Sequence, residues 1–550
     1  MFILIPVSVA SFPEEKDFFV EPSFDHLSRR KVEMELLLTT NYINFYASSI
    51  WWEDLSEEKR REYEKIMYGM GNDFERNIYP WMTDNFGNMP LHQITGSRDR
   101  ITVVLHPMED GSGGYFRTGD QYSIYQYPRS NEGNILYLNA NLIEDGNISG
   151  YLAHEYVHLV TFNEKNKEFG INEEVWLNEL RAEIIITILG YNDIYEESNL
   201  KERKGTFLRS PDVSVTEWTE RISDYGVTNI FGHYLLDHYG EDIFSDSLGI
   251  DMVGISSLNH ALATHEKRFS EVFTEWTIAI YLNDCSHGEY YCFKNRHLEN
   301  LTVSPLNAAI SSEREEPLSI EEETKNWAGN WYRIEGDEGT LHFDFYGKDG
   351  FVVPYILCQK EKDCEIDFLD LNKKGEGGMI IEDFTRDHSL TIIPSLQKKI
   401  RDFNGVEDYH SFRWEVEIEK KEEDSKEDIR IKELRQRLDS LEEKIEELYF
   451  LIIGKRLATD TTFQKLENDL YFGMTNSEEV RNLQKFLKEQ GEHIYPEGLV
   501  TGNFYEMTRR AVIRFQEENR KEILEPLGLS EGTGYVGKYT REFINFLLEK

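Results

Sequence analysis

The chain has 550 residues, of which 29% are charged and 13% aromatic, and its formal net charge at pH 7 is −42. This excess of negative charge repels phosphate backbones and anionic lipid surfaces, so the composition argues against nucleic-acid binding. The length predicts three or four domains. No run of 18 or more apolar residues occurs, so no membrane-spanning helix is predicted.

The apolar N-terminus, MFILIPVSVASF, has two interpretations: the tail of a truncated signal peptide, or an N-terminal β-strand. Ser8, Val9 and Ala10 fit the small-x-small pattern of a signal-peptidase site, although the positively charged start of a signal peptide is missing. We therefore separate residues 1–15, as a truncated signal peptide or tail, from a first domain predicted over residues 16–325.

Within this first domain, ITVVLHPM (101–108) and NILYLNANL (134–142) are predicted strands, and the glycine-rich turn GSGGYF follows the first of them. The apolar stretch YLAHEYVHLV (151–160) then carries the spacing His-Glu-x-x-His. Positions i and i+4 lie on one face of a helix, so His154 and His158 can share one metal ion, and Glu155 lies beside them as a base.

This spacing also arises by chance in roughly a few per cent of chains of this length, and the alternative is a surface helix with two solvated histidines. The apolar neighbours argue instead for buried histidines, which need partners. A second predicted helix, NEEVWLNELRAEIIITILGY (172–191), follows the short polar turn NEKNKEFG and can lie antiparallel to the first. It offers Glu179 as a third ligand. Glu183, one turn later, can accept the second ring N–H of a ligand histidine.

HEYVH, followed by twenty residues and then Glu179 in VWLNE, resembles the gluzincin metallopeptidases, and most closely the hyicolysin-type neutral metallopeptidases. The resemblance implies an α+β peptidase domain with one catalytic Zn²⁺, bound by His154, His158 and Glu179, and with Glu155 as the general base. One departure is Leu180, where the family usually has glycine.

The same family carries a catalytic tyrosine downstream. DYGVTNIFGHYLLDHYG (224–240) is similar to that segment, which gives Tyr225 the role of oxyanion donor, with His233 and Tyr234 as competitors. The strand NILYLNANL resembles the edge strand on which such enzymes bind the substrate backbone.

Four cysteines fall in two close pairs, Cys285 with Cys292 and Cys358 with Cys364. Neither pair has C-x-x-C metal spacing, and each could close a small loop as a disulfide in an oxidising compartment. Four unrelated thiols are the alternative. The second pair lies in residues 326–420, where HSFRWEVEIEK and TLHFDFYG alternate apolar and polar residues, which predicts a β-sandwich domain.

The charge run EKKEEDSKEDIR (419–430) is typical of a linker and leads into the predicted linker and helix of residues 421–465. An apolar seam with alternating spacings of three and four then runs through residues 429–453, with isoleucine at most a positions and leucine at the d positions. This pattern favours a helical spacer that forms a parallel two-stranded coiled coil and hence a homodimer. The alternative is a single amphipathic helix that packs on its own chain.

The C-terminal block, residues 466–550, looks like the three-helix peptidoglycan-binding domain of secreted wall enzymes. The resemblance rests on VRNLQKFL, GLVTGNFYEMTRRAVIRFQ and GYVGKYTREFIN. It implies peptidoglycan as a partner, with Tyr505, Tyr535 and Tyr539 as candidate contacts. A helical bundle without glycan affinity is the alternative.

The sequence therefore predicts a multidomain, secreted or cell-wall-associated zinc endopeptidase that acts on protein or peptide substrates. The alternative function is a catalytically inactive peptidase scaffold that acts as a wall-binding or adhesive protein, and the intact Glu155 favours the enzyme. An aminopeptidase would need an acidic anchor such as Gly-x-Met-Glu-Asn before the zinc helix, and the sequence has no such motif.

Overall fold

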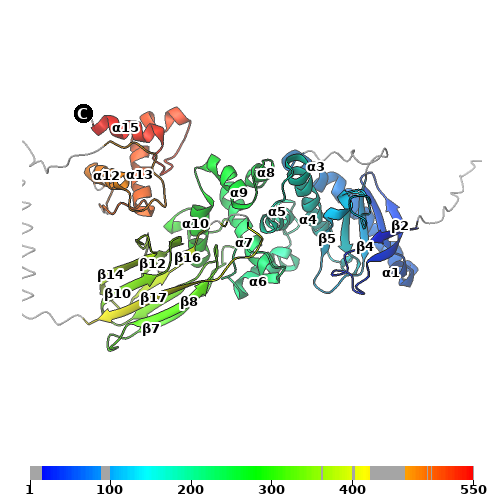
Figure 1. The fold of residues 1–550 in the computed structure, drawn as a ribbon, viewed down its shortest axis with the longest axis horizontal. Coiled ribbons are helices and arrows are strands. Elements are labelled where there is room, and N and C mark those ends of the chain that lie inside the picture. Colours follow the sequence, from blue (N-terminus) through cyan, green and yellow to red (C-terminus); the bar gives the residue numbers. More distant parts are fainter. Residues whose placement is uncertain are drawn as a thin grey trace, which may run out of the picture. The chain divides into compact units, whose positions relative to one another are not determined.

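The computed structural model describes residues 15–87, 100–360, 363–398, 400, 403–420, 465–491, 493–496, 498 and 500–548. The chain is multidomain, with helices and several sheets, and it forms two compact units (Figure 1). The first unit ends at Val303 but also takes in the short segment 399–407, and the second comprises the rest of the chain from Ser304. The predicted signal-peptide tail falls almost entirely outside the described residues, as does the whole predicted coiled coil at 429–453.

The first unit contains a six-stranded sheet in the order β1-β2-β3-β4-β6-β5. Its strands are β1 (Glu15–Phe19), β2 (Lys31–Thr39), β3 (Ile43–Ser48), β4 (Ile101–His106), β5 (Gly114–Phe116) and β6 (Ile135–Asn139). β3, β4 and β6 pair in parallel, and β5 is antiparallel to β6. All five residues of β6 are buried, because the strand is covered on both faces and paired on both sides.

This arrangement corrects one prediction. The strand expected at the edge of the sheet, within 134–142, is the internal strand β6, and the edge is β5. β5 has only three residues and begins in the glycine-rich turn, so it carries no alternating apolar pattern that a sequence could reveal.

Ten helices of the first unit are α1 (Ser49–Asp54), α2 (Glu57–Asp73), α3 (Tyr79–Asn85), α4 (Ile148–Thr161), α5 (Val175–Ile188), α6 (Asn199–Arg209), α7 (Ile222–Tyr239), α8 (Asp242–Leu248), α9 (Gly254–Leu262) and α10 (Phe269–Leu282). α4 packs on α5, and α7 packs on both α5 and α6. α4 and α5 are apolar on nearly every side, so they form the buried centre of the unit rather than an amphipathic outer layer.

The β-rich part of the second unit consists of two facing sheets of four and five strands, with a short two-stranded pair beside them. Its strands are β7 (Leu306–Ile310), β8 (Leu318–Thr324), β9 (Tyr332–Gly336), β10 (Gly339–Tyr346), β11 (Phe351–Val352), β12 (Pro354–Gln359), β13 (Asp363–Phe368), β14 (Glu376–Phe384), β15 (His388–Ile392), β16 (Ser395–Leu396) and β17 (His410–Glu419). The alternating residues of β10 and β17, Phe343, Phe345, Trp414 and Val416 among them, fill the core between the sheets.

The boundary of this part differs from the predicted 325/326. β7 and β8 belong to it, although LSIEEET in β8 is too acidic to predict a core strand. Conversely, the segment 399–407 makes its contacts in the first unit, where Gly405 O accepts a hydrogen bond from Trp218 N at 2.8 Å. The structure joins Cys285 to Cys292 and Cys358 to Cys364, the latter pair across opposed positions of β12 and β13.

The C-terminal part contains α12 (Glu478–Glu489), α13 (Glu506–Glu518), the short α14 (Arg520–Ile523) and α15 (Lys538–Leu548). It carries an internal repeat that the apolar pattern did not reveal. The Gln484 amide donates to Thr508 Oγ1 at 2.9 Å, and Gln516, 32 residues later, donates to Thr540 Oγ1 at 3.0 Å. Each glutamine also accepts a hydrogen bond from a backbone N–H of the glycine-containing turn that precedes its threonine. Two equivalent sets of hydrogen bonds therefore fix α13 and α15.

Among the described residues, no helix combines the length and the apolarity that crossing a bilayer requires.

Candidate metal centre

α4 and α5 bring the three predicted ligands together. The shortest distances are 3.3 Å between His154 Nε2 and Glu179 Oε2, and 3.6 Å between His158 Nε2 and Glu179 Oε1. One ligand atom from each residue lies within 4.8 Å of the others. Ligands that surround a zinc ion tetrahedrally at about 2.0–2.2 Å lie roughly 3.3–3.6 Å apart, so these side chains fit such an ion.

The electrostatics of the cluster also suit a cation. Burial alone opposes protonation of His154, yet the hydrogen bond to Glu179 and the surrounding carboxylates raise its pKa to about 9. Burial raises the pKa of Glu155 to about 8, and the negative charge of Glu179 adds to this rise. The site thus holds a surplus of negative charge that a divalent ion would neutralise.

Glu155 lies beside the three ligands and not among them. Its side chain is 5% exposed, and its Oε2 has no hydrogen-bond partner within the described residues. Glycine at position 114 lets β5 lie close to this carboxylate, because a Cβ atom there would lie 2.9 Å from Glu155 Oε1 and 2.6 Å from Tyr137 O. A buried carboxylate with an unused oxygen is suited to accept a proton from a water molecule at the metal.

A second layer of polar side chains supports the ligands. Glu183 Oε1 lies 3.7 Å from His154 Nδ1, and its carboxylate accepts hydrogen bonds from Arg203 at 2.9 and 3.1 Å and from Asn229 at 3.0 Å. His158 Nδ1 has no hydrogen-bond partner among the described residues, and burial lowers the pKa of His158. Sequence analysis anticipated Glu183, but it missed Arg203 and Asn229.

The neutral variant Glu183→Gln is expected to weaken zinc binding by about 10- to 100-fold, the usual effect of losing a group that orients a ligand histidine. A competition titration against a zinc-chelating dye measures this change. Glu202→Gln is the matched control, because Glu202 also pairs with Arg203, at 3.7 Å, but is 68% exposed. Equal zinc affinities of the two variants would show that Glu183 does not support His154.

A pocket of about 400 Å³ opens over the cluster. Its lining includes the residues of β5, the loop that follows β5, all three ligands, Glu155 and Tyr225. Tyr225 stands in the first turn of α7, with its ring against Trp218 at 4.7 Å and under the guanidinium of Arg203 at 4.8 Å. Gly226 allows this position, because a Cβ atom there would lie 2.9 Å from Phe207 N of α6.

The competing donors on α7 are engaged elsewhere. The Tyr234 hydroxyl donates to Tyr290 O at 2.8 Å, and both ring nitrogens of the fully buried His233 have hydrogen-bond partners, Thr187 Oγ1 and Asn229 O. In the part of the chain that the structure describes, the Tyr225 hydroxyl makes no hydrogen bond, so it alone of the three is left to face a bound molecule.

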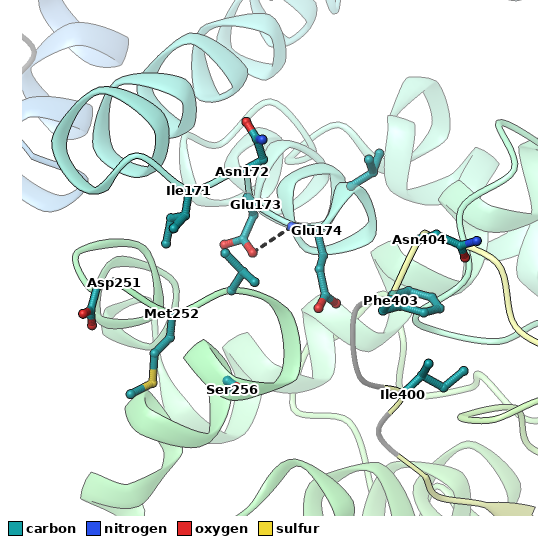
Figure 2. A pocket seen from close by; sticks show the side chains of 13 residues that line it. Ile171, Asn172, Glu173, Glu174, Asp251, Met252, Ser256, Ile400, Phe403 and Asn404 are labelled. Atoms are coloured by element: carbon teal, nitrogen blue, oxygen red, sulfur yellow. Dashed lines mark hydrogen bonds between the residues drawn. The ribbon is translucent and has the colours of Figure 1, made fainter.

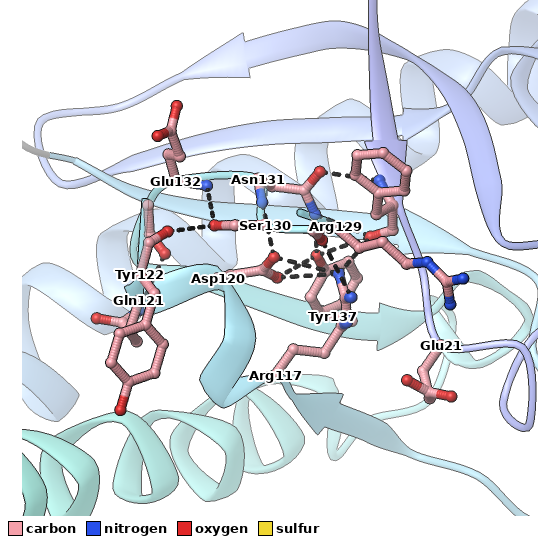
Figure 3. A network of polar contacts seen from close by, with 12 residues as sticks. Glu21, Arg117, Asp120, Gln121, Tyr122, Arg129, Ser130, Asn131, Glu132 and Tyr137 are labelled. Carbon is pink, nitrogen blue, oxygen red and sulfur yellow. Dashed lines mark hydrogen bonds and ion pairs between the residues drawn. The ribbon is translucent and has the colours of Figure 1, made fainter. Parts of the chain in front are cut away.

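A buried polar network fixes the loop after β5 (Figure 3). Asp120, fully buried, accepts hydrogen bonds from Tyr137 Oη at 2.6 Å, Asn131 N at 2.8 Å and Arg117 Nη1 at 3.1 Å. Arg117 also donates to Phe19 O of β1 at 2.9 Å. The network ties the loop after the edge strand to β1 and β6. No motif in the sequence pointed to it.

Comparisons with known proteins agree with the motifs. Residues 476–544 match a family described as "Putative peptidoglycan binding domain". The chain is 22% identical over 326 residues to "Neutral metalloprotease ShpI" of Staphylococcus hyicus, an alignment that covers 50% of this chain and 71% of that relative. The predicted resemblance, to a hyicolysin-type metallopeptidase with a peptidoglycan-binding-like domain, is thereby confirmed.

Two solved structures align with about a fifth of the chain. The pre-peptidase C-terminal domain of a Bacillus anthracis collagenase has a TM-score of 0.15 and 7% identity, with 21% of this chain and 97% of that chain covered. The lysozyme inhibitor PliG of Aeromonas hydrophila has a TM-score of 0.15 and 8% identity, with 21% and 100% covered. Such scores say nothing about function.

Proposed function

We propose that this chain is a secreted zinc-dependent endopeptidase that is held at the cell wall by its C-terminal domain. The observation that carries the proposal is the convergence of His154, His158 and Glu179 beside the buried carboxylate of Glu155, at the floor of an open pocket. Homology to a metalloprotease supports a metallopeptidase with a metal cofactor. The two-histidine, one-carboxylate ligand set is typical of catalytic zinc.

Each residue has a role that follows from its position. A bound zinc ion would act as a Lewis acid and lower the pKa of a coordinated water to about 7. Glu155 takes the proton of the attacking water and passes it to the leaving amine nitrogen. The Tyr225 hydroxyl donates a hydrogen bond to the oxyanion that develops on the scissile carbonyl.

The edge strand β5 is the proposed backbone-binding element. Because Gly114–Phe116 forms the edge of the sheet and also lines the pocket, an extended peptide can add to it by main-chain hydrogen bonds. This addition places the substrate backbone beside Glu155. The arrangement favours an endopeptidase, since an edge strand accepts an extended chain on both sides of the scissile bond.

The alternative, an inactive scaffold that serves as a wall-binding or adhesive protein, has less support. A protein without catalysis gains nothing from a buried carboxylate that lacks a hydrogen-bond partner, since burial of such a group opposes folding. Glu155 is such a group.

A metal-dependence assay separates the two functions. The purified chain is expected to cleave casein, to lose this activity after dialysis against a chelator, and to recover it on addition of one equivalent of zinc. Protein treated with chelator and then re-saturated serves as its own control for unfolding. A chain that contains zinc and yet leaves casein intact would favour the inactive scaffold.

The C-terminal domain is proposed to bind peptidoglycan, on the strength of its family match. A chain with a net charge of −42 will not bind the largely anionic wall by charge, so hydrogen bonds and stacking onto sugars and stem peptides are the expected contacts. Tyr539, which is 40% exposed, is one candidate. Association with the wall raises the local concentration of enzyme near wall proteins.

Truncation after residue 425 tests the tether. The shortened enzyme is expected to cleave soluble casein at nearly the full rate, because the proposed ligands and Tyr225 all precede residue 245, but no longer to sediment with purified peptidoglycan. Full-length Glu155→Gln is the control that sediments without cleaving. Equal sedimentation of the truncated and full-length chains would refute the tether and leave a resemblance of fold alone.

A further inference from the structure

One wall of the metal pocket has no part in the proposed reaction. Besides the residues already described, Glu21 and Phe24 line the pocket, and both belong to the turn that follows β1. The Phe24 ring packs on the ring of Tyr115 in β5 at 4.7 Å. The turn therefore stands beside the edge strand to which the substrate backbone is proposed to add.

Hydrogen bonds fix the main chain of this turn. Glu21 N donates to Tyr115 Oη at 3.1 Å, and Glu21 O accepts from Phe24 N at 3.1 Å and from Asp25 N at 3.2 Å. The fully buried Asp25 carboxylate accepts the Arg29 backbone N–H at 2.9 Å and pairs with the Arg29 guanidinium at 2.7 Å. The backbone of Glu21 is thus engaged on both sides, and its side chain is left to contact a bound molecule.

The carboxylate of Glu21 is not compensated by a neighbouring charge. Among the described residues, the acidic side chains that line the pocket are Glu21, Glu155 and Glu179, and the last two belong to the metal centre. Glu21 is half-buried, and its carboxylate makes no hydrogen bond or ion pair within the described part of the chain. Figure 3 shows it beside Arg117, whose guanidinium is instead paired with the buried Asp120 at 3.1 Å.

A larger cavity of the first unit, of about 890 Å³, differs in this respect (Figure 2). Its described acidic side chains each interact with another residue of the chain: Glu173 with Arg181, Glu174 with Trp176 and Asp251 with Lys165. An uncompensated carboxylate therefore distinguishes the wall of the metal pocket from the wall of the larger cavity.

A carboxylate beside an aromatic ring complements the side chain of lysine or arginine. The alkyl stem can lie on the Phe24 ring while the cationic head pairs with Glu21. A hollow of about 400 Å³ is about 9 Å wide, which an extended peptide crosses in about three residues at about 3.3 Å each. A side chain that reaches Glu21 therefore belongs to a residue close to the scissile bond.

We propose that Glu21 and Phe24 form a substrate subsite for a lysine or arginine side chain, within about three residues of the scissile bond. The inference rests on the proposed peptidase function and adds a residue preference to it. A free α-ammonium group at the start of a peptide offers the same charge, so the test separates the two sources.

The test is a digestion of randomised ten-residue peptides by the full chain. One library is acetylated at the amino terminus, a second has free amino termini, and mass spectrometry identifies the early products. Competing peptides are cut in proportion to their kcat/KM, so residue frequencies near the cut measure preference. In the acetylated library, lysine and arginine are expected to be enriched about three- to tenfold over glutamine at one position, as for a half-buried charge pair.

Variants assign the preference to the subsite. Glu21→Gln should abolish the enrichment, and Glu21→Lys should reverse it in favour of aspartate and glutamate. Glu109→Gln is the matched control: Glu109 is exposed and its N–H donates to Phe24 O at 2.8 Å, so it lies beside the same turn, but it does not line the pocket. The control removes the same charge and should keep the enrichment.

Four results would contradict the subsite. Cleavage by the wild-type chain without enrichment of lysine or arginine would overturn it alone, as would an equal loss of enrichment in Glu21→Gln and Glu109→Gln. A preference found only in the library with free amino termini, at a fixed distance from that end, would assign Glu21 to the α-ammonium group instead. Absence of cleavage by the wild-type chain in either library would overturn the proposed function, and the subsite with it.

Discussion

Glu155→Gln is expected to lower kcat on casein by about 10³-fold or more while the chain keeps its zinc, since proton transfer by a positioned base contributes about 10²–10⁴-fold to a rate. The amide has the shape of the carboxylate, so the pocket and the adjacent Gly114 are not disturbed. It cannot accept the proton of the attacking water. Casein turnover and zinc content by atomic emission, measured on the same preparation, check both parts.

Glu179→Ala is the contrasting variant. It removes a ligand, so activity and zinc should be lost together, whereas Glu155→Gln separates them. If Glu155→Gln cleaves casein at the wild-type rate, Glu155 is not the base. If it loses zinc as Glu179→Ala does, Glu155 binds the metal and the division of roles between the two carboxylates is wrong.

Tyr225→Phe is expected to lower kcat by about 10²- to 10³-fold, the usual cost of one missing oxyanion donor, with little change in KM. The phenyl ring keeps its packing on Trp218 and under Arg203, so the variant loses the hydroxyl and little else. Because the hydrogen bond forms only as charge develops on the carbonyl oxygen, its loss acts on kcat. Steady-state kinetics on a fluorogenic peptide measure the two constants.

Tyr234→Phe makes the same chemical change on the same helix and is the control. Its hydroxyl donates to Tyr290 O outside the pocket, so it should cost stability and leave kcat nearly unchanged. A Tyr225→Phe enzyme with a kcat near that of Tyr234→Phe would remove Tyr225 from the reaction.

The metal cluster could be predicted from the sequence, because the spacing of residues along a helix determines which side chains lie on the same face. His154 and His158 lie one turn apart on α4, and the segment 162–174, which begins with the helical stretch Phe162–Glu168, leads to α5 and lets Glu179 reach them. Glu183 follows Glu179 by one turn and therefore faces the same histidines. These relations are local and depend little on the rest of the fold.

Features that depend on tertiary contacts could not be predicted from the sequence. Arg203 reaches Glu183 from α6, a helix with no motif, and Asp120 acquires its role only when Tyr137 and Arg117 surround it. The edge position of β5 depends on sheet order, which three residues with a leading glycine do not encode. The acidic β8 joins its sheet by pairing with β17, and only its two apolar residues Leu318 and Ile320 pack against the core.

The measurement that tests the account most directly is anomalous diffraction at the zinc absorption edge from crystals of the full chain grown with zinc. The account predicts one strong peak, about 2.0–2.1 Å from Nε2 of His154 and of His158 and about 2.0–2.2 Å from a carboxylate oxygen of Glu179. Glu155 should lie outside this ligand distance. A peak held by other side chains, or none between α4 and α5, would contradict the metal centre and the peptidase mechanism built on it.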